Sequence, residues 1–394
     1  MNIKVLIIRP FPDVLDVNTY NVQEIGLAKA LAFKGLDCGI ILYNGKNTNR
    51  IETYKFDRDG SYYSFKIYWL KGISFFKNGF MPSAFEIIEK YDVIQVHEYD
   101  QIFSWMIYSK LKKPTVIYHG PYYHEYAKGY NLKCRVFDTL FFRFGNYKHV
   151  VALTKSELAA DFLRGKGFCK VNAVGVGVDS DKFLLETGEK LECPLTEDRT
   201  KFRILYVGKI EKRRNISFLL ELFEKLQESV ENLQLIIVGN GEKEYVSAFL
   251  ERIQRWLEEG KIIYFPKATQ KELAMIYQRV NLFAFTSNYE IFGMVLLEAM
   301  YFGLPVISSM NGGASVLIQN EVNGYIMQDF DISLWKNKII ELMENKEHAI
   351  LIGERAKKTI LNGFLWDKLS NKFIAAYEDA IKEYQGLNGI INNE

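Results

Sequence analysis

The sequence is poor in the residues that build metal and disulfide sites. Its 394 residues include only four cysteines and five histidines. The cysteines are scattered, and none forms the C-x-x-C spacing that is typical of zinc or redox centres. No cluster of His, Cys and Glu has the spacing of metal ligands either. We therefore expect no metal and no cofactor, and a reducing cytoplasm is the simplest setting.

Long apolar runs are also missing. No stretch approaches the roughly 20 apolar residues that a membrane span requires. The opening residues, MNIKVLIIRP, hold a run too short for the core of a signal peptide, and they predict a buried first strand instead. We expect a cytoplasmic protein, with peripheral association at the inner membrane face as an alternative.

Long runs of one charge are absent as well. The formal net charge is only +2, although basic residues are in excess in the first half and acidic residues in the second. A basic half can face an anionic partner such as a membrane or a phosphorylated acceptor. Scattered, solvated charge is the simpler interpretation, and nothing indicates a nucleic-acid partner.

Short β-rich apolar runs recur along the chain, with amphipathic stretches between them. They cover residues 4–9, 38–43, 92–97, 115–119, 149–154, 202–208, 233–239, 261–265, 282–287 and 305–309. Nearly continuous Val/Ile/Leu strands that alternate with helices are typical of parallel sheets covered on both faces. The length and the two series predict an α/β protein with two doubly wound, Rossmann-like domains that face a central cleft.

The predicted domain boundary lies where GVGVDSDKF (175–183) leads into the acidic, irregular stretch ETGEKLECPLTEDRT (186–200). We assign residues 1–185 to an N-terminal domain and 186–374 to a C-terminal domain. Within the first domain, TYKFDRDGSYYSFKIYWL (53–70) predicts two strands around an Asp-Gly turn. That turn also explains the D-x-D of residues 57–59, which might otherwise be taken for a metal site.

Two glutamates in NYEIFGMVLLEAMYFGLPVIS (288–308) stand at unusual positions. Glu290 follows a predicted buried strand, and Glu298 lies about one turn into an apolar helix that starts after Gly293 and ends at Gly303. The first backbone N–H groups of this helix favour a diphosphate. Glu298 could accept hydrogen bonds from the vicinal hydroxyls of a ribose, and Glu290 would face whatever lies beyond the phosphates. Alternatively, Glu290 is an ordinary loop carboxylate and Glu298 a surface helix residue.

A basic loop follows a strand in the same half of the chain. YVGKIEKRRNISFLLELF (206–223) places four cations between that strand and the next helix: Lys209, Lys212, Arg213 and Arg214. Such cations can neutralise a pyrophosphate leaving group without a metal ion. The alternative is a solvated basic loop.

These segments resemble the retaining GT-B glycosyltransferases of family 4, also called glycosyltransferase group 1. EIFGMVLLEAMYFGLPV (290–306) is similar to the family signature, in which a second Glu comes eight positions after an acidic residue. GKIEKRRN (208–215) resembles the diphosphate loop, with Lys and Arg exchanged, and VGNG (238–241) resembles V-G-x-G. NGGASVLIQNEVNGYI (311–326) and GFLWDKL (363–369) also match, so that the resemblance covers most of residues 200–385.

The resemblance implies a metal-independent, retaining hexosyltransferase with a nucleotide-sugar donor domain at the C-terminal side. Glu298 would hold the donor ribose and Glu290 the transferred sugar, and residues 265–267 would lie beside the nucleobase. The implied donor-binding residues are Gly208, Lys209, Arg214, Gly239, Phe265, Pro266, Lys267, Glu290, Phe292, Gly293, Met294, Val295 and Glu298. A C-terminal helix, about residues 375–394, would pack back on the acceptor-side N-terminal domain.

The N-terminal half matches less closely. Similar enzymes often carry Gly-Gly in the first strand-to-helix loop, where alignment through GLAKAL (26–31) puts Asn18 and Thr19, followed by Tyr20 and Asn21. Side chains there would narrow the approach to the donor phosphates and the acceptor. His119, at the end of TVIYHG (115–120), resembles the histidine that sits beside the reacting sugar.

Three further residues or segments in this half are weaker candidates. His97 ends the strand DVIQVH (92–97), and His124 follows a few residues after His119. The aromatic stretch DTLFFRFGNY (138–147) fits a membrane surface weakly. A core helix with Phe137, Phe141 and Phe144 on one stripe is the better interpretation.

The leading hypothesis is therefore a retaining glycosyltransferase with His119, Glu290, Lys209 and Arg214 as its catalytic residues. It would move a sugar from a nucleotide-diphosphate sugar, with UDP expected, to the hydroxyl of a sugar or lipid-linked glycan. Capsule, exopolysaccharide, lipopolysaccharide or glycolipid synthesis is the expected setting. The alternatives are a non-catalytic sugar-nucleotide-binding protein, a glycoside phosphorylase of the same fold and a sugar-nucleotide epimerase.

Overall fold

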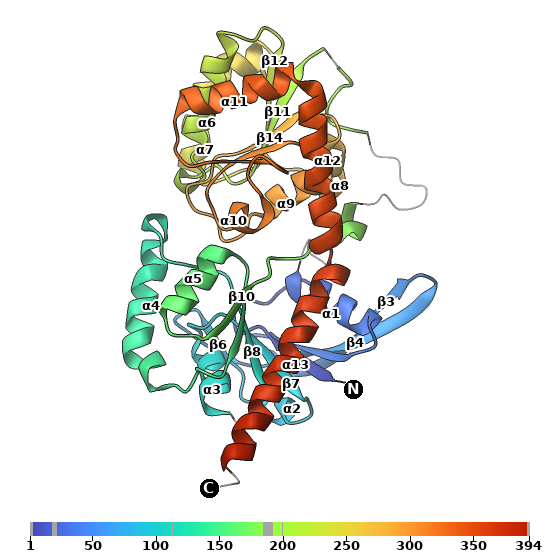
Figure 1. The fold of residues 1–394 in the computed structure, drawn as a ribbon, viewed down its shortest axis with the longest axis vertical. Coiled ribbons are helices and arrows are strands. Elements are labelled where there is room, and N and C mark those ends of the chain that lie inside the picture. The colour runs from blue at the N-terminus through green and yellow to red at the C-terminus, as the bar shows by residue number, and fades with distance from the viewer. Residues whose placement is uncertain (1–2, 18–21, 112, 184–191, 199, 392–394) are drawn as a thin grey trace. The chain divides into compact units, whose positions relative to one another are not determined.

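The computed structural model describes residues 3–17, 22–111, 113–183, 192–198 and 200–391 (Figure 1). The chain divides into two compact units. The first consists of Met1–Asp179 with Leu365–Glu394, and the second of Ser180–Phe364. The sequence places the corresponding boundaries at 185 and about 375. Each unit is an α/β structure built on its own sheet, as predicted.

The first unit contains an eight-stranded sheet with the order β10-β9-β8-β7-β1-β2-β4-β3. All neighbouring strands are parallel except β3 and β4, which form the predicted hairpin. Asp59 and Gly60 form its turn with φ values of 51° and 73°. Positive φ at both central residues is typical of the type I′ turn that Asp-Gly favours in hairpins. The strands are β1 (Lys4–Ile8), β2 (Asp37–Tyr43), β3 (Arg50–Arg58), β4 (Ser61–Leu70), β7 (Val93–His97), β8 (Thr115–His119), β9 (Val151–Thr154) and β10 (Lys170–Ala173).

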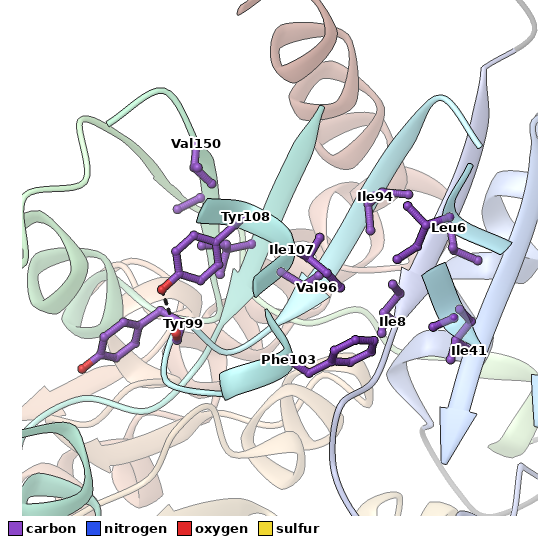
Figure 2. Close-up of a cluster of buried hydrophobic side chains, with 14 of the residues drawn as sticks. Leu6, Ile8, Ile41, Ile94, Val96, Tyr99, Phe103, Ile107, Tyr108 and Val150 are labelled. Carbon is purple, nitrogen blue, oxygen red and sulfur yellow. Dashed lines mark hydrogen bonds between the residues drawn. The ribbon is translucent and has the colours of Figure 1, made fainter. Parts of the chain in front are cut away.

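Alternation along the strands sends apolar side chains to both faces of this sheet. Leu6 and Ile8 of β1 join the buried cluster shown in Figure 2, together with Ile94 and Val96 of β7. Helices cover this face because their apolar sides contribute to the same cluster. They are α2 (Ala84–Ile88), α3 (Ile102–Lys110), α4 (Lys128–Leu140) and α5 (Glu157–Gly165). A short second hairpin, β5 (Ile73–Phe75) and β6 (Asn78–Phe80), precedes α2.

The other face carries helices from opposite ends of the chain. α1 (Gln23–Phe33) packs against α13 (Trp366–Ile391), and Figure 1 shows α13 lying across the strands of the first unit. The Trp366 ring lies so close to Gly26 that a Cβ there would come within 2.2 Å of its Nε1. Farther along α13, the Tyr377 hydroxyl donates to Gln95 Oε1 of β7 at 2.6 Å. The C-terminal helix is thus part of the core of the first unit.

The second unit contains a six-stranded parallel sheet with the order β13-β12-β11-β14-β15-β16. Counted from β11, this is the order 3-2-1-4-5-6 of a Rossmann fold, and its switch point lies between β11 and β14. The strands are β11 (Phe202–Val207), β12 (Leu233–Val238), β13 (Ile262–Phe265), β14 (Leu282–Phe285), β15 (Val306–Ser309) and β16 (Tyr325–Met327). The helices are α6 (Ile216–Gln227), α7 (Lys243–Glu258), α8 (Gln270–Tyr277), α9 (Met294–Tyr301), α10 (Ala314–Leu317), α11 (Ile332–Glu344) and α12 (Lys346–Gly363).

Four further one-turn 3-10 helices complete the described secondary structure. They cover Glu125–Ala127, Phe142–Phe144, Ser180–Phe183 and Lys212–Arg214. Among the described residues, none of the helices combines the length and the apolar composition that crossing a membrane would need.

Candidate functional site

The switch point of the second unit brings together the two segments that the sequence singles out. One follows β11 and contains residues 208–215, and the other follows β14 and contains residues 286–293. The Thr286 hydroxyl donates to the carbonyl of Arg214 at 3.1 Å, and the Asn288 amide donates to the carbonyl of Arg213 at 2.8 Å. The basic loop and the Glu290 loop are therefore neighbours at the edge where doubly wound sheets bind ligands.

The centre of this site is an ion pair between Arg214 and Glu290. Arg213 adds a longer contact, with its Nη1 3.7 Å from Glu290 Oε2, and its Nη2 lies 2.8 Å from Glu211 Oε1. The Arg214 guanidinium also donates to the Ser287 hydroxyl at 3.2 Å. Glu290 is thus held in place by cations of the neighbouring loop.

Arg214 is largely buried, with 13% of its side chain exposed. Burial, together with the nearby Arg213, lowers the pKa of Arg214 to about 10. The side chain therefore still carries its charge at neutral pH. Lys209 and Lys212 are exposed, which agrees with a solvated basic loop. Arg214 is less exposed than these lysines, and a solvated loop does not explain its position.

Glu298 lies on α9 and is only 1% exposed. Its Oε2 accepts a hydrogen bond from the Tyr277 hydroxyl at 3.1 Å. Because a buried carboxylate is costly unless it is hydrogen-bonded or paired, this position is built for a polar group. The interpretation of Glu298 as a surface helix residue is wrong, and its expected contact with a ribose stays a prediction.

The start of α9 is shaped by glycine. Gly293 precedes the helix with φ 76°, and a Cβ there would lie 3.0 Å from the Phe285 ring and 3.1 Å from Cγ of Glu290. The predicted donor-binding residues around it differ in exposure, since Phe292 is buried whereas Met294 and Val295 are half-buried.

A turn that the sequence analysis assigned no role holds the Glu290 loop from the other side. The Gly312 amide donates to the Glu290 carbonyl at 3.0 Å, and a Cβ on Gly313 would lie 1.7 Å from the Phe292 carbonyl oxygen. Asn311 anchors the turn, because its Nδ2 donates to the Ser309 carbonyl at 2.8 Å and its Oδ1 accepts from the Ala314 amide at 3.1 Å. Two adjacent glycines shortly after a predicted strand, at 312 and 313, were the available signal.

Two further glycines let the first two strand-end loops touch. A Cβ on Gly239, where φ is 144°, would come within 2.0 Å of the Gly208 carbonyl oxygen. The Gly239 amide donates to the carbonyl of Phe265, at the end of β13, at 2.9 Å. Phe265 is half-buried, whereas Pro266 and Lys267, expected beside the nucleobase, are exposed.

In the first unit, His119 ends β8 and contacts a glutamate that the sequence analysis did not identify. The Nδ1 atom of His119 lies 2.5 Å from Glu98 Oε2, which also accepts from the Gly120 amide at 3.1 Å. Glu98 follows β7 directly and adopts φ 59°, a strained value for a residue with a side chain. The rule that carboxyl ends of neighbouring parallel strands meet could have found it.

Burial opposes ionisation of Glu98, but His119, Lys155 and the Gly120 amide outweigh it and lower the pKa of Glu98 to about 2. The carboxylate is therefore ionised at neutral pH and fixes the orientation of the imidazole. The His119 ring is fully buried, stacked on Phe162 with centroids 5.5 Å apart. Its Nε2 finds no hydrogen-bond acceptor or donor among the described residues.

The remaining first-unit candidates have mainly structural contacts or lie outside the described residues. His97 is buried, with Nδ1 3.5 Å from Glu24 Oε1, and burial lowers the pKa of His97 to about 4. His124 precedes a short 3-10 helix, where its Nδ1 accepts from the Tyr126 amide at 3.3 Å. Asn18, Thr19, Tyr20 and Asn21 lie outside the described part of the chain.

Glu98, Asp100 and His119 each place a potential ligand atom within 4.8 Å of the others. Their charges are already matched, because Lys133 Nζ lies 2.8 Å from Asp100 Oδ2 and Lys155 Nζ 3.8 Å from Glu98 Oε1. Glu98 and His119 also contact each other directly, so that each of these groups already has a partner within the protein.

Comparison with known proteins identifies the second unit. Residues 189–359 match the family model described as glycosyl transferases group 1. The second unit is therefore similar to glycosyl transferases group 1 along nearly its whole length. It contains the Arg214–Glu290 pair, Glu298 and the Asn311 turn.

Curated relatives match about half of the chain. A probable sucrose-phosphate synthase of Thermosipho melanesiensis is 26% identical over 183 residues, 45% of this chain and 42% of its own. A D-inositol 3-phosphate glycosyltransferase of Mycolicibacterium paratuberculosis is 26% identical over 219 residues, which cover 55% of this chain and 48% of its own. The capsular polysaccharide biosynthesis glycosyltransferase CapM of Staphylococcus aureus is 26% identical over 214 residues, which cover 53% of this chain and 54% of its own. The chain thus spans about half the length of the curated relatives it matches.

Solved structures are similar over nearly the whole chain. A sucrose-phosphate synthase from Thermosynechococcus elongatus has a TM-score of 0.69 at 17% identity, covering 95% of this chain and 98% of its own. Anabaena HepE in complex with UDP has a TM-score of 0.65 at 15% identity, covering 95% and 99%. The two Rossmann-like units are those of a GT-B fold, which confirms the predicted fold class.

Proposed function

We propose that this protein is a retaining, metal-independent glycosyltransferase of family 4 that uses a nucleotide-diphosphate sugar, with UDP as the expected nucleotide. The observation that carries the proposal is the meeting of Arg214 and Glu290 at the switch point of a unit that is similar to glycosyl transferases group 1. One loop brings cations and the next brings a carboxylate, which is the pairing that a diphosphate linked to a sugar requires.

The Arg214–Glu290 pair suggests how the donor is received. A diphosphate beside Arg214 would compete with Glu290 for the guanidinium and release the carboxylate to accept hydrogen bonds from the sugar hydroxyls. Exposed Lys209 adds a mobile cation to the leaving group. Charge that develops on the departing diphosphate is then stabilised by side chains that already carry the opposite sign.

The proposed transfer needs no enzymic nucleophile. The bond from the anomeric carbon to the phosphate oxygen breaks, and the acceptor oxygen bonds to the same face of that carbon. The proton of the acceptor hydroxyl passes to the departing phosphate oxygen, which acts as the base. A covalent route through Glu290 is the less favoured course, because the hydrogen bonds that this carboxylate would accept from the sugar hydroxyls weaken it as a nucleophile.

His119 is assigned to the sugar side of the reaction on the basis of the family resemblance. Glu98 is the residue that orients its ring, by the contact to Nδ1. Because the ring is fully buried, contact with the sugar requires movement of the residues that cover it. Domain closure on donor binding is one such movement.

The donor and acceptor classes rest on chemistry and on relatives. A solved structure of the same fold, Anabaena HepE, contains UDP, which supports a uridine nucleotide. CapM is named for capsular polysaccharide biosynthesis, which supports a sugar or lipid-linked glycan as the acceptor. A cytoplasmic enzyme that works at the inner membrane face would meet both substrates.

The test is product analysis. The protein is incubated with a panel of UDP- and GDP-sugars and glycan acceptors in the presence of EDTA, and nucleotide release and the anomeric coupling constant of the product are measured. Transfer with the donor's anomeric configuration is the expected result. Inversion, a strict requirement for divalent metal, or turnover only with free phosphate would contradict the proposal. Epimerisation of the donor without transfer would also contradict it.

A further inference from the structure

Helix α4 of the first unit exposes a row of large apolar side chains. Leu132, Val136 and Leu140 recur every four residues, and they are 64%, 50% and 58% exposed. Residues spaced by four lie above one another on one face of a helix. Phe144, in the 3-10 turn that follows, is 58% exposed and extends the row.

This row is separate from the face by which α4 packs into the unit. Cys134 and Phe137 are buried in the core cluster, and Tyr130 and Phe141 pack against it from partly buried positions. Leu132 lies on the other side of the helix, because it is two residues from both Tyr130 and Cys134 and thus about 200° around the axis from each. Leu140 and Phe144 continue the exposed side chains at the C-terminal end of the helix and in the turn that follows. The sequence-based expectation of one core stripe with Phe137, Phe141 and Phe144 is wrong for Phe144.

Cations surround the row. Lys128 stands one turn before Leu132, Arg135 flanks the row, and both are exposed. The Cζ atom of the Arg143 guanidinium lies 4.5 Å from the centroid of the Phe144 ring. Lys110 Nζ donates to the Phe144 carbonyl at 3.3 Å. We call these four cations, with Leu132, Val136, Leu140 and Phe144, the α4 surface.

Acidic residues do not balance these charges. Within residues 125–144 the acidic side chains are Glu125 and Asp138, and Asp138 is paired with Lys166. Among the described residues, no ion pair involves any of the four cations of the α4 surface. Apolar side chains with an unbalanced rim of cations complement an anionic surface that has an apolar interior.

A second exposed apolar group is anchored to the same loop as α4. At the tip of the β5–β6 hairpin, Phe76 is 80% exposed although its φ is 44°, a backbone value that is unfavourable for an aromatic residue. Asn78 Oδ1 of the hairpin accepts from the Ile102 amide at 2.8 Å, and Lys133 of α4 pairs with Asp100. The hairpin and α4 therefore contact the same short segment, residues 100–102.

We propose that the α4 surface is a docking site for an anionic lipid bilayer. Leu132, Val136, Leu140 and Phe144 would enter the boundary between headgroups and acyl chains, and the four cations would contact phosphate or carboxylate headgroups. This inference does not depend on the proposed donor chemistry, because donor binding involves the second unit and lipid binding the first.

Vesicle flotation of the full-length protein tests this inference. Vesicles of phosphatidylcholine alone are compared with vesicles that also contain phosphatidylglycerol, at low and high salt. We expect binding only to the anionic vesicles, weakened by salt because exposed charges are screened. The variant Leu132→Gln/Val136→Gln/Leu140→Gln should reduce the bound fraction roughly tenfold, and Arg135→Gln/Arg143→Gln by a similar factor.

Matched controls come from exposed residues of the second unit. The control for the apolar triple variant changes Leu334, Ile350 and Leu351, which are exposed on α11 and α12. The control for the cation pair variant changes Arg355 and Lys358, which are exposed on α12. Their Gln variants should float like the wild type. Glutamine is a good helix former, so that all variants should keep the wild-type circular dichroism spectrum and thermal midpoint.

Three results would overturn the proposal. The first is wild-type protein that does not float with anionic vesicles, and the second is equal binding to neutral vesicles. The third is a dimer, detected by light scattering, that only the Leu132/Val136/Leu140 variant breaks, because the α4 surface would then be covered by a second copy of the chain. Donor binding measured in parallel should be unchanged in every variant, so that a failure here is distinct from a failure of the proposed enzyme activity.

Discussion

Arg214 and Glu290 are 76 positions apart in the chain, yet they form the charged centre of the second unit. Their contact depends on one fact of topology, since the loops after β11 and β14 meet only because these strands are neighbours in the sheet. The backbone bond between Asn288 and Arg213 then sets the distance between the loops. The side chains of Arg214 and Glu290 therefore meet because the backbones of their two loops are already held together.

Replacing Glu290 by glutamine should lower kcat by about 10²–10³. The amide keeps the size of the side chain but cannot pair with Arg214 or support positive charge on the transferred sugar. The thermal midpoint should change little, because Glu211 also lies near Arg214, with Oε1 3.7 Å from its Nε. Turnover is measured with the best donor, and Glu228→Gln, at an exposed pair with Lys225, is the control. A wild-type kcat for Glu290→Gln would remove Glu290 from the reaction.

Stability should depend on pH through His97. Burial holds the pKa of His97 at about 4 against an ordinary value of 6.5, so that the unfolded chain binds the proton first. The resulting stability is complete above pH 6.5 and is lost as the pH falls from 6.5 to 4, by about 3 kcal/mol in all. Urea unfolding from pH 4 to 7 measures this slope.

His97→Gln should flatten that slope, whereas His124→Gln should leave most of it, because the His124 ring is only partly buried. The same slope in wild type and His97→Gln would show that another group titrates in this range.

At the scale of elements, much could be predicted from the sequence, because strand and helix positions follow from local patterns. The ten β-rich runs correspond to strands in the structure, and α9 ends at Tyr301 before Gly303, near the expected end. Phe144 could not be placed in the same way. α4 stops at Leu140 and a 3-10 turn follows, so that the helical phase which would have buried Phe144 is lost. Glu98 was missed because its partner His119 is set by strand order and not by spacing along the chain.

The close approach of Gly239 to Gly208, in the loops after β12 and β11, should not tolerate an added methyl group. Gly239→Ala would force a Cβ to within 2.0 Å of the Gly208 carbonyl oxygen and should cost about 2 kcal/mol or more. It should also reduce donor affinity by moving the Gly208 loop. Gly129→Ala is the control, because a Cβ there meets nothing within 4 Å. Urea unfolding and donor titration check both effects, and equal stability of the two variants would contradict the close approach.

The packing of α13 on the first unit should depend on Trp366. Its ring fills the space against Gly26 and Gly177, where a Cβ would come within 2.2 Å and 2.4 Å of ring atoms. Trp366→Ala should destabilise the protein by about 3–5 kcal/mol because a large cavity replaces the ring. Leu361→Ala, at a partly exposed position of α12, should cost far less. Calorimetry compares the two, and similar midpoints would mean that α13 does not contribute to the core.

At the scale of the whole molecule, the fold class could be predicted because two series of buried strands specify two doubly wound sheets. The residues assigned to the proposed reaction come from both units, with Arg214 and Glu290 in the second and His119 with Glu98 in the first. Sugar and acceptor identity could not be predicted, because a few hydrogen bonds decide them and their geometry depends on side chains from separate segments.

The central claim is that the second unit holds a nucleotide-diphosphate sugar through Arg214. We would titrate wild type and Arg214→Ala with a panel of UDP- and GDP-sugars by calorimetry, with EDTA present and with Arg255→Ala, on the exposed face of α7, as the control. The account predicts that one donor binds wild type and the control equally, and that Arg214→Ala loses roughly tenfold or more in affinity. Absence of binding to every nucleotide sugar, or equal binding by Arg214→Ala, would contradict it.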